Sequence, residues 1–226
     1  MTILSMSGWT QPHDALAELA PEAEMLDYSL YGSAERLFES LAHKRYEGVV
    51  AWSLGAQLAV RAVQRGVIAP KWMVLLAPPL QFVNDESFKD GMDPLTYGLF
   101  REGYEKEPLR SMTRFHGLLV KGDRHFKQIL ADLTHHERVE DALHWLPWLD
   151  DLAAQKREHF EEGSLPPTLL IQGREDVVVP ATQAEAWKLL LPEIDVRIIE
   201  EMGHTPHLHD PKMVREWIDA HRELHG

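Results

Sequence analysis

The chain has 226 residues, 44% hydrophobic and 26% charged, a balance typical of one soluble globular domain with a large core. Its formal net charge of −13 argues against nucleic acid as a partner, because no broad basic surface is expected. No apolar run is long enough to cross a membrane, and no secretory signal is visible. The absence of cysteine excludes disulfides and thiolate metal sites. We therefore expect a cytoplasmic protein, a monomer, with no membrane partner.

The first part of the chain alternates short apolar runs with amphipathic stretches. Strands are predicted at Thr2–Ser7, Glu24–Tyr28, Val49–Trp52 and Lys71–Ala77, and helices at Gln11–Ala20, Ser33–His43 and Leu54–Gly66. This alternation predicts an α/β fold, a mostly parallel sheet with helices on both faces. In such sheets the reactive groups lie beyond the carboxyl ends of the strands.

Between residues 82 and 163 the strand-like runs disappear, and helical segments punctuated by glycine and proline take over. Met112–Leu133 is amphipathic, and Ala142–Leu152 is rich in Trp and Leu. A helical insertion between two strands is typical of a cap over an active site. A second helical domain of unrelated role is the alternative.

After Pro166-Pro167 the αβ pattern resumes, with strands predicted at Thr168–Gln172 and Asp195–Glu200 and helices at Thr182–Leu191 and Pro211–Leu224. The predicted organisation is a core formed by residues 1–81 and 164–226 with a helical cap at 82–163.

Ser53 lies where a buried strand passes into a helix with no polar loop between them. A serine at such a junction, with small residues two positions away on both sides, is the pattern of a nucleophile elbow. Those positions hold Ala51 and Gly55, so the motif is A-x-S-x-G rather than G-x-S-x-G. The alternative is that Ser53 is an ordinary helix N-cap.

Asp176 and His204 each follow one of the next predicted strands, so the three residues occur in the order Ser…Asp…His. A serine hydroxyl needs a base to take its proton, which would be His204, and Asp176 would orient that imidazole. The backbone N–H groups of Trp9 and Leu54 are the candidate oxyanion hole. Trp9 alternatively reads as a core aromatic residue.

His204, His207 and His209 are close in sequence and suggest a metal site at first sight. A zinc motif with i, i+4 spacing needs a regular helix, and Pro206 argues against one here. We therefore expect no metal and no cofactor.

Three stretches carry a resemblance to a known family: the elbow W-S-L-G-A-Q-L-A, the early G-W, and G-H-T-P-H-L-H-D-P near the C-terminus. With the helical insertion, they resemble the α/β-hydrolase superfamily over nearly the whole chain. Within it the likeness is greatest to the pimeloyl-carrier-protein methyl ester esterases of biotin synthesis (the BioH type). The stretches Arg114–Leu133 and D-A-L-H-W-L-P-W-L-D-D-L look like cap segments of that family.

This resemblance implies the catalytic roles of Ser53, Asp176 and His204. It also implies an acyl site lined by Trp9, Leu54 and 115–119, including Phe115, Leu118 and Leu119. Family members grip an acidic carrier protein through basic cap residues, which here would be Arg110, Arg114 and Lys127. A surplus of cations over Arg101–Lys127 fits that role, although a solvated face of mixed charge is the alternative.

Three features depart from the family pattern: Ala51 in the elbow, Ser7 where the family usually has His, and a start that lacks the leading strands of relatives. The expected function is a serine carboxylesterase acting on a methyl ester, with a carrier-bound pimeloyl chain as the leading substrate. The alternatives are a broad esterase, lactonase or carbon–carbon-bond hydrolase, and a non-catalytic binding protein on the same scaffold.

Overall fold

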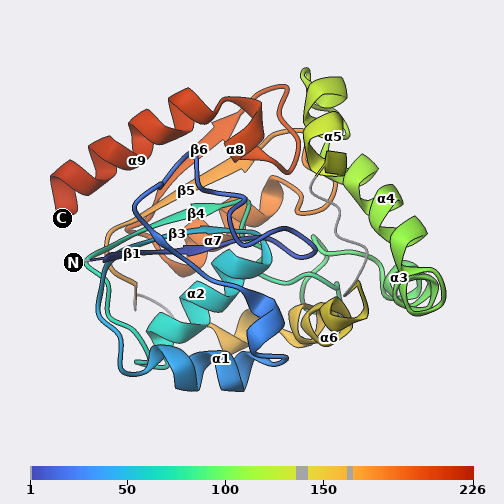
Figure 1. Cartoon of the computed structure of the whole chain (residues 1–226), viewed down its shortest axis with the longest axis horizontal. Helices are drawn as coiled ribbons and strands as arrows, with labels where there is room; N and C mark the ends of the chain where they lie inside the picture. The colour runs from blue at the N-terminus through green and yellow to red at the C-terminus, as the bar shows by residue number, and fades with distance from the viewer. Residues whose placement is uncertain (1, 136–141, 162–164) are drawn as a thin grey trace.

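The computed structural model describes residues 2–135, 142–161 and 165–226 (Figure 1). The predicted boundary at 163/164 lies outside these residues. The division into core and cap stays a prediction.

Six parallel strands form a single sheet in the order β2-β1-β3-β4-β5-β6. The strands are β1 (Thr2–Met6), β2 (Glu24–Met25), β3 (Tyr46–Trp52), β4 (Trp72–Leu76), β5 (Thr168–Gly173) and β6 (Asp195–Ile199). In the central strand β4 all five residues are buried, which explains why its sequence is apolar without alternation. Because all strands are parallel, their carboxyl ends share one edge of the sheet, and the predicted fold class is confirmed.

Helices cover both faces of the sheet. In Figure 1, α1 (Ala34–Leu41) and α2 (Leu54–Gln64) lie on one side, and α9 (Pro211–His225) lies on the other. The sequence pattern of α1 explains its position, because its buried residues are spaced at i, i+3, i+4 and i+7: Ala34, Leu37, Phe38 and Leu41. The remaining elements of the C-terminal part are α7 (Thr182–Leu190) and the one-turn α8 (Pro206–His209).

Helices also fill the stretch between β4 and β5. These are α3 (Pro94–Lys106), α4 (Pro108–Leu119), α5 (Phe126–His135) and α6 (Leu146–Ala154), with short 3-10 turns at Ala142–Trp145 and Arg157–His159. We call the four helices the α3–α6 group. In Figure 1 they lie together beyond the end of the sheet where the strands finish. The predicted amphipathic stretch Met112–Leu133 is two helices, because tight turns after Leu118 and Val120 interrupt it.

Two predictions in the first 30 residues are wrong. Gln11–Ala20 is a series of turns instead of a helix, with bonds such as Ala15 N to Pro12 O. Its apolar residues Leu16, Leu19 and Ala20 are still buried, and turns satisfy that spacing as well as a helix does. The predicted strand Glu24–Tyr28 is cut to two residues, because a 3-10 turn capped by Asp27 begins at Tyr28.

Candidate active site

Ser53 occupies a strained turn between β3 and α2. Its backbone has φ 53° and ψ −117°, a conformation that L-residues rarely adopt. The hydroxyl makes no capping bond to α2, so the N-cap alternative does not describe it. Gly55 allows the tight approach to β1, since a Cβ there would lie 2.3 Å from Met6 O. Ala51 is an ordinary buried residue of β3, so the departure at this position leaves the turn intact.

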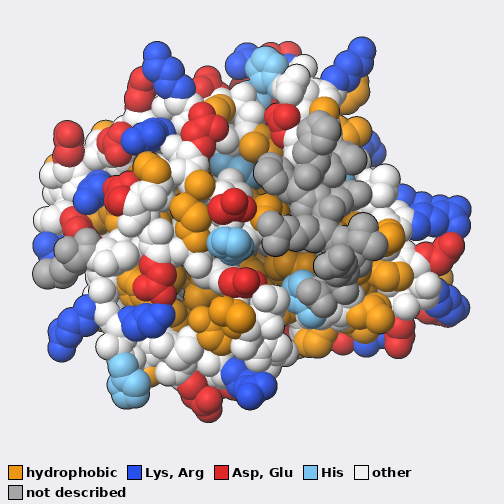
Figure 2. Space-filling view, viewed as in Figure 1, with side chains coloured by type: hydrophobic (Ala, Val, Ile, Leu, Met, Phe, Trp, Pro, Cys, Tyr) orange, Lys and Arg blue, Asp and Glu red, His pale blue; other side chains and the backbone are white. Residues whose placement is uncertain are grey.

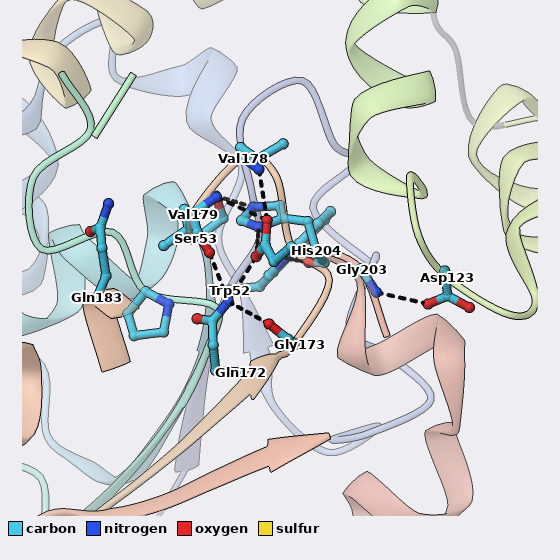
Figure 3. Close-up of polar contacts among 12 residues, drawn as sticks. Trp52, Ser53, Asp123, Gln172, Gly173, Val178, Val179, Gln183, Gly203 and His204 are labelled. Carbon is cyan, nitrogen blue, oxygen red and sulfur yellow. Dashed lines mark hydrogen bonds and ion pairs between the residues drawn. The ribbon is translucent and has the colours of Figure 1, made fainter. Parts of the chain in front are cut away.

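The structure joins the three predicted residues by hydrogen bonds (Figure 3). His204 Nε2 lies 2.9 Å from Ser53 Oγ, and His204 Nδ1 lies 2.6 Å from Asp176 Oδ2. A carboxylate only accepts, so Nδ1 carries the proton, and Nε2 is left to accept from the serine hydroxyl. The three residues are 6%, 1% and 5% exposed in the order Ser53, His204 and Asp176. Burial limits the competition from water for these bonds.

Asp176 is oriented by its own neighbours on the loop after β5. Its Oδ1 accepts from the backbone N–H groups of Val178 and Val179, at 2.8 and 2.9 Å. Its Oδ2 accepts from Gln172 Nε2 at 2.9 Å as well as from His204. With both oxygens engaged, the carboxylate has one orientation toward the imidazole.

Trp52, the residue before Ser53, was missed by the sequence reading. Its indole Nε1 donates to His204 O at 2.8 Å, and its ring lies 4.2 Å from the ring of His207. Gly8 abuts the same indole, at 2.9 Å for an added Cβ. Trp52, which stands between Ala51 and Ser53 in the elbow motif, therefore links the turn at Ser53 to the loop that carries His204. Its burial within an apolar run gave no signal for this role.

The two candidate oxyanion donors lie at the predicted strand ends. Trp9 follows β1 by a short loop, and Leu54 is the first residue of α2. Among the described residues neither backbone N–H has a hydrogen-bond acceptor in the protein. The α2 dipole adds partial positive charge beside Leu54. Both N–H groups are therefore free to bind an anionic oxygen.

The side chain of Trp9 is only 2% exposed and contacts the α3–α6 group. Its ring packs against Phe100, Tyr104 and Phe115 at 5.7, 4.9 and 5.0 Å, and its Nε1 donates to Trp145 O at 2.8 Å. The indole of Trp9 is therefore a core aromatic side chain, and the oxyanion role of its backbone N–H stays a prediction.

The other residues assigned to the acyl site lie on α4. Phe115 and Leu119 are buried, whereas Leu118 is 38% exposed. Leu119 is next to the triad, because its carbonyl accepts from His204 N at 2.8 Å. Contact of these side chains with an acyl chain stays a prediction.

The three basic residues assigned to carrier binding lie on α4 and α5. Arg110 pairs with Glu107 at 3.0 Å, both side chains being well exposed. Arg114 and Lys127 have no carboxylate partner among the described residues, and Lys127 Nζ lies 5.9 Å from the Phe126 ring. Figure 2 shows cationic and anionic side chains interspersed along the edge of the molecule over α3 and α4.

The three clustered histidines of the sequence have separate partners. His204 belongs to the triad, His207 packs on Trp52, and His209 Nδ1 bonds Asp123. Within the described ranges, no group of three or more His, Asp or Glu is arranged to hold a metal ion. Pro206 is the first residue of α8, where its missing N–H costs nothing, so the helix carries His207 and His209 but does not extend back to His204.

A cavity of about 540 Å³ lies at the opposite edge of the sheet. Its lining includes Thr168 and Asp195, the first residues of β5 and β6, together with Trp217 and His221 of α9. The cavity is thus separated from Ser53 by the length of the strands.

In the described part of the chain, no helix is long and apolar enough to cross a bilayer.

Sequence comparison finds named relatives. The chain is 28% identical over 200 residues to a pimeloyl-[acyl-carrier protein] methyl ester esterase of Nitrosomonas europaea, covering 83% of this chain and 77% of that protein. It is 26% identical over 219 residues to a biotin biosynthesis bifunctional protein BioHC of Cellvibrio japonicus, covering 91% of this chain and 43% of that protein. The predicted resemblance is therefore confirmed.

Solved structures support the fold. An esterase from Exiguobacterium antarcticum superposes with a TM-score of 0.81 at 12% identity, covering 99% of this chain and 92% of that one. A hydrolase from Oleispira antarctica superposes with a TM-score of 0.82 at 12% identity, covering 98% and 90%. A family model described as "Alpha/beta hydrolase family" matches residues 6–217. With this match over most of its length, the chain belongs to the alpha/beta hydrolase family.

Proposed function

We propose that the protein is a serine carboxylesterase with Ser53 as nucleophile, His204 as base and Asp176 as the orienting acid. Ser53 Oγ adds to the ester carbonyl as its proton passes to His204 Nε2. Collapse of the tetrahedral intermediate expels the alcohol, which takes that proton, and leaves Ser53 acylated. Water then adds to the acyl-enzyme, and the acid is released as the proton returns to Ser53 through His204.

One observation carries this proposal: the unbroken hydrogen-bonded chain from Asp176 through His204 to Ser53 in a nearly buried site. Asp176 keeps the proton on His204 Nδ1 and stabilises the imidazolium that forms. The free N–H groups of Trp9 and Leu54 would receive the oxyanion, and each such donor is worth about 3 kcal/mol of transition-state stabilisation.

The proposed substrate is the methyl ester of a carrier-bound pimeloyl chain. Two lines support it. Relatives from Nitrosomonas europaea and Nitrosospira multiformis carry the name of that esterase, at 28% and 26% identity. Arg114 and Lys127 are cations without a carboxylate partner among the described residues, on a chain of net charge −13. Such cations can attract an acidic carrier.

A small-molecule ester is the second candidate substrate. It is favoured by the ion pairs that neutralise other cations of the same region, namely Arg101 with Asp150, Lys106 with Glu102 and Arg110 with Glu107. These pairs are mostly exposed and therefore weak, so an acidic partner could still displace them.

Replacement of the nucleophile tests the chemistry. Ser53→Ala should lower kcat on a short p-nitrophenyl ester by about 10³-fold or more, because no other hydroxyl of the described residues is bonded to His204. Ser29→Ala, at an exposed serine, is the control and should retain activity. A fluorophosphonate should label the wild-type protein at Ser53. Absence of labelling together with unchanged hydrolysis in Ser53→Ala would favour the non-catalytic reading.

Charge reversal tests the substrate. The double variant Arg114→Glu/Lys127→Glu should raise KM for a carrier-linked methyl ester by about 10-fold, while hydrolysis of the p-nitrophenyl ester stays unchanged. Arg36→Glu is the matched control, since Arg36 is exposed on α1, far from α4 in Figure 1. Equal kinetics of both variants on the carrier-linked ester would instead favour the small-molecule reading.

A further inference from the structure

We propose that Asp123 and His209 are positioning residues that hold the catalytic base in place. This inference rests on the proposed function, because it assigns how His204 is held for that reaction. Asp123 lies on the α4–α5 connection (residues 120–125), and His209 lies on α8. In the described part of the chain, no hydrogen bond joins either residue to Ser53 or Asp176. Both act through the His204 loop (residues 200–205).

The carboxylate of Asp123 accepts hydrogen bonds from three segments of the chain. Its Oδ2 accepts from the backbone N–H of Gly203 at 3.1 Å (Figure 3), directly before the catalytic histidine. Its Oδ1 accepts from His125 N at 2.7 Å, which closes the turn of the α4–α5 connection. His209 Nδ1 lies 3.0 and 2.9 Å from the two oxygens. One side chain thus ties the α4–α5 connection, the His204 loop and α8 together.

Three backbone contacts reinforce this junction. His204 N donates to Leu119 O at 2.8 Å, and Arg124 N donates to Glu201 O at 3.0 Å. A Cβ on Gly203 would lie 2.7 Å from Leu119 O, so the two segments are in tight contact. The loop is consequently held on both sides of Gly203, while Trp52 holds the carbonyl of His204.

The Asp123–His209 pair is shielded from solvent. The side chains of His209 and Asp123 are 1% and 0% exposed. Burial by itself raises the pKa of Asp123, but hydrogen bonds from His209, His125 N and Gly203 N outweigh it and hold that pKa below its ordinary value. Asp123 is therefore a carboxylate that only accepts, and His209 Nδ1 must donate to it. His209 Nε2 has no hydrogen-bond partner among the described residues, so Nδ1 makes the ring's polar contact with Asp123.

The consequence for catalysis is geometric. The imidazole must meet Ser53 Oγ and Asp176 at once, and a displacement of about 1 Å is enough to cost about 10²-fold in rate. Loss of the Gly203 anchor moves the backbone adjacent to His204. Substrate contacts are not altered, so the effect falls on kcat and leaves KM nearly unchanged.

Kinetics on a p-nitrophenyl ester test the proposal in the whole chain. Asp123→Asn and His209→Leu should each lower kcat by about 10- to 100-fold, with KM within about twofold of the wild type. His209→Asn should recover most of the kcat that His209→Leu loses, because an amide N–H can replace Nδ1–H toward Asp123. Asp93→Ala is the matched control, since Asp93 accepts from Leu95 N and Thr96 N at the start of α3, remote from the His204 loop.

A thermal melt of each variant separates positioning from simple loss of stability. Asp93→Ala should lower Tm without lowering kcat, whereas Asp123→Asn lowers kcat at temperatures where it is fully folded. Wild-type kcat in folded Asp123→Asn and His209→Leu would overturn the inference.

Side-chain ¹⁵N NMR of the histidines reads the position of His204 without any turnover. The His204 Nδ1–H resonance, in its bond to Asp176, should shift or broaden in Asp123→Asn and His209→Leu and return in His209→Asn. An unchanged resonance in both would also overturn the inference. An inactive wild type with the expected NMR changes would contradict the esterase proposal alone.

Discussion

At the residue scale, Ser53 combines local strain with a crowded neighbourhood. Its φ of 53° places the hydroxyl at the tip of the turn, where it reaches His204. A non-glycine residue in such a conformation costs about 1–3 kcal/mol, and the surrounding contacts must hold it. Ser53 N donates to Leu76 O at 2.9 Å, and Gly55 allows α2 to approach β1. The strain is thus held by both neighbours of β3.

Gly55→Ala should destabilise the protein by about 2 kcal/mol or more, because the added methyl overlaps the Met6 carbonyl, whose backbone is fixed in the sheet. Gly98→Ala is the control. It lies in α3 with open space around its Cβ position, and it should be neutral or stabilise by about 0.5–1 kcal/mol. Urea unfolding at pH 7 measures both. Equal stability of the two variants would show that the α2–β1 contact relaxes easily.

At the element scale, α6 connects the rest of the α3–α6 group to α2, the helix that begins at Leu54. Asp151 of α6 forms two hydrogen bonds with Arg61 of α2, at 2.5 and 3.2 Å, and these side chains are only 23% and 11% exposed. The adjacent Asp150 pairs with Arg101 of α3. Two adjacent acidic residues of α6 therefore pair with two different helices, Asp151 with α2 and Asp150 with α3.

Asp151→Ala should lower the free energy of unfolding by about 1–3 kcal/mol, because it leaves a half-buried Arg61 guanidinium without its partner. Glu35→Ala is the matched control, since it removes the exposed partner of Arg65, the residue directly after α2, and should cost about 0–1 kcal/mol. Chemical denaturation of the two variants compares them. A larger loss in Glu35→Ala would contradict the assignment of α6 as an anchor.

At the scale of the whole molecule, buried neutral histidines make stability depend on pH. Burial lowers the pKa of His207 to about 3, with a smaller effect from His204, and burial lowers the pKa of His116 to about 4. Both folded-state values lie below the unfolded value of about 6.5. As the pH falls through about 6.5, the unfolded chain binds protons that the folded chain does not, so stability falls.

Between pH 7 and pH 5, His207 alone should cost about 2 kcal/mol of stability. Carboxylates with lowered pKa values, such as Asp123 and Asp150, contribute to stability at pH 7 and pH 5. They lose that contribution only as the pH falls below their unfolded-state pKa of about 4 toward the lower folded-state pKa. His207→Phe keeps an aromatic ring beside Trp52 and should reduce the pH 7 to pH 5 loss by about 2 kcal/mol in urea unfolding. An unchanged loss would contradict a neutral His207.

Much of the fold could be predicted, because inner strands such as β4 and β5 are short, apolar and buried along their whole length. Lys71–Ala77 and Thr168–Gln172 are strands within a residue or two of the prediction. The failures were local. In Gln11–Ala20 the apolar spacing fits turns as well as a helix, and the predicted strand Glu24–Tyr28 is shortened by a 3-10 turn that begins at Tyr28.

The sequence by itself predicted the turn at Ser53 and the order of Ser53, Asp176 and His204, because each residue follows a strand whose pattern is visible along the chain. Only the tertiary structure decided how these residues are held. Trp52 and Asp123 reach the His204 loop from segments 152 and 80 residues away in the chain. Such contacts depend on which backbone groups the packed strands and helices bring within hydrogen-bond distance, and no local pattern records them.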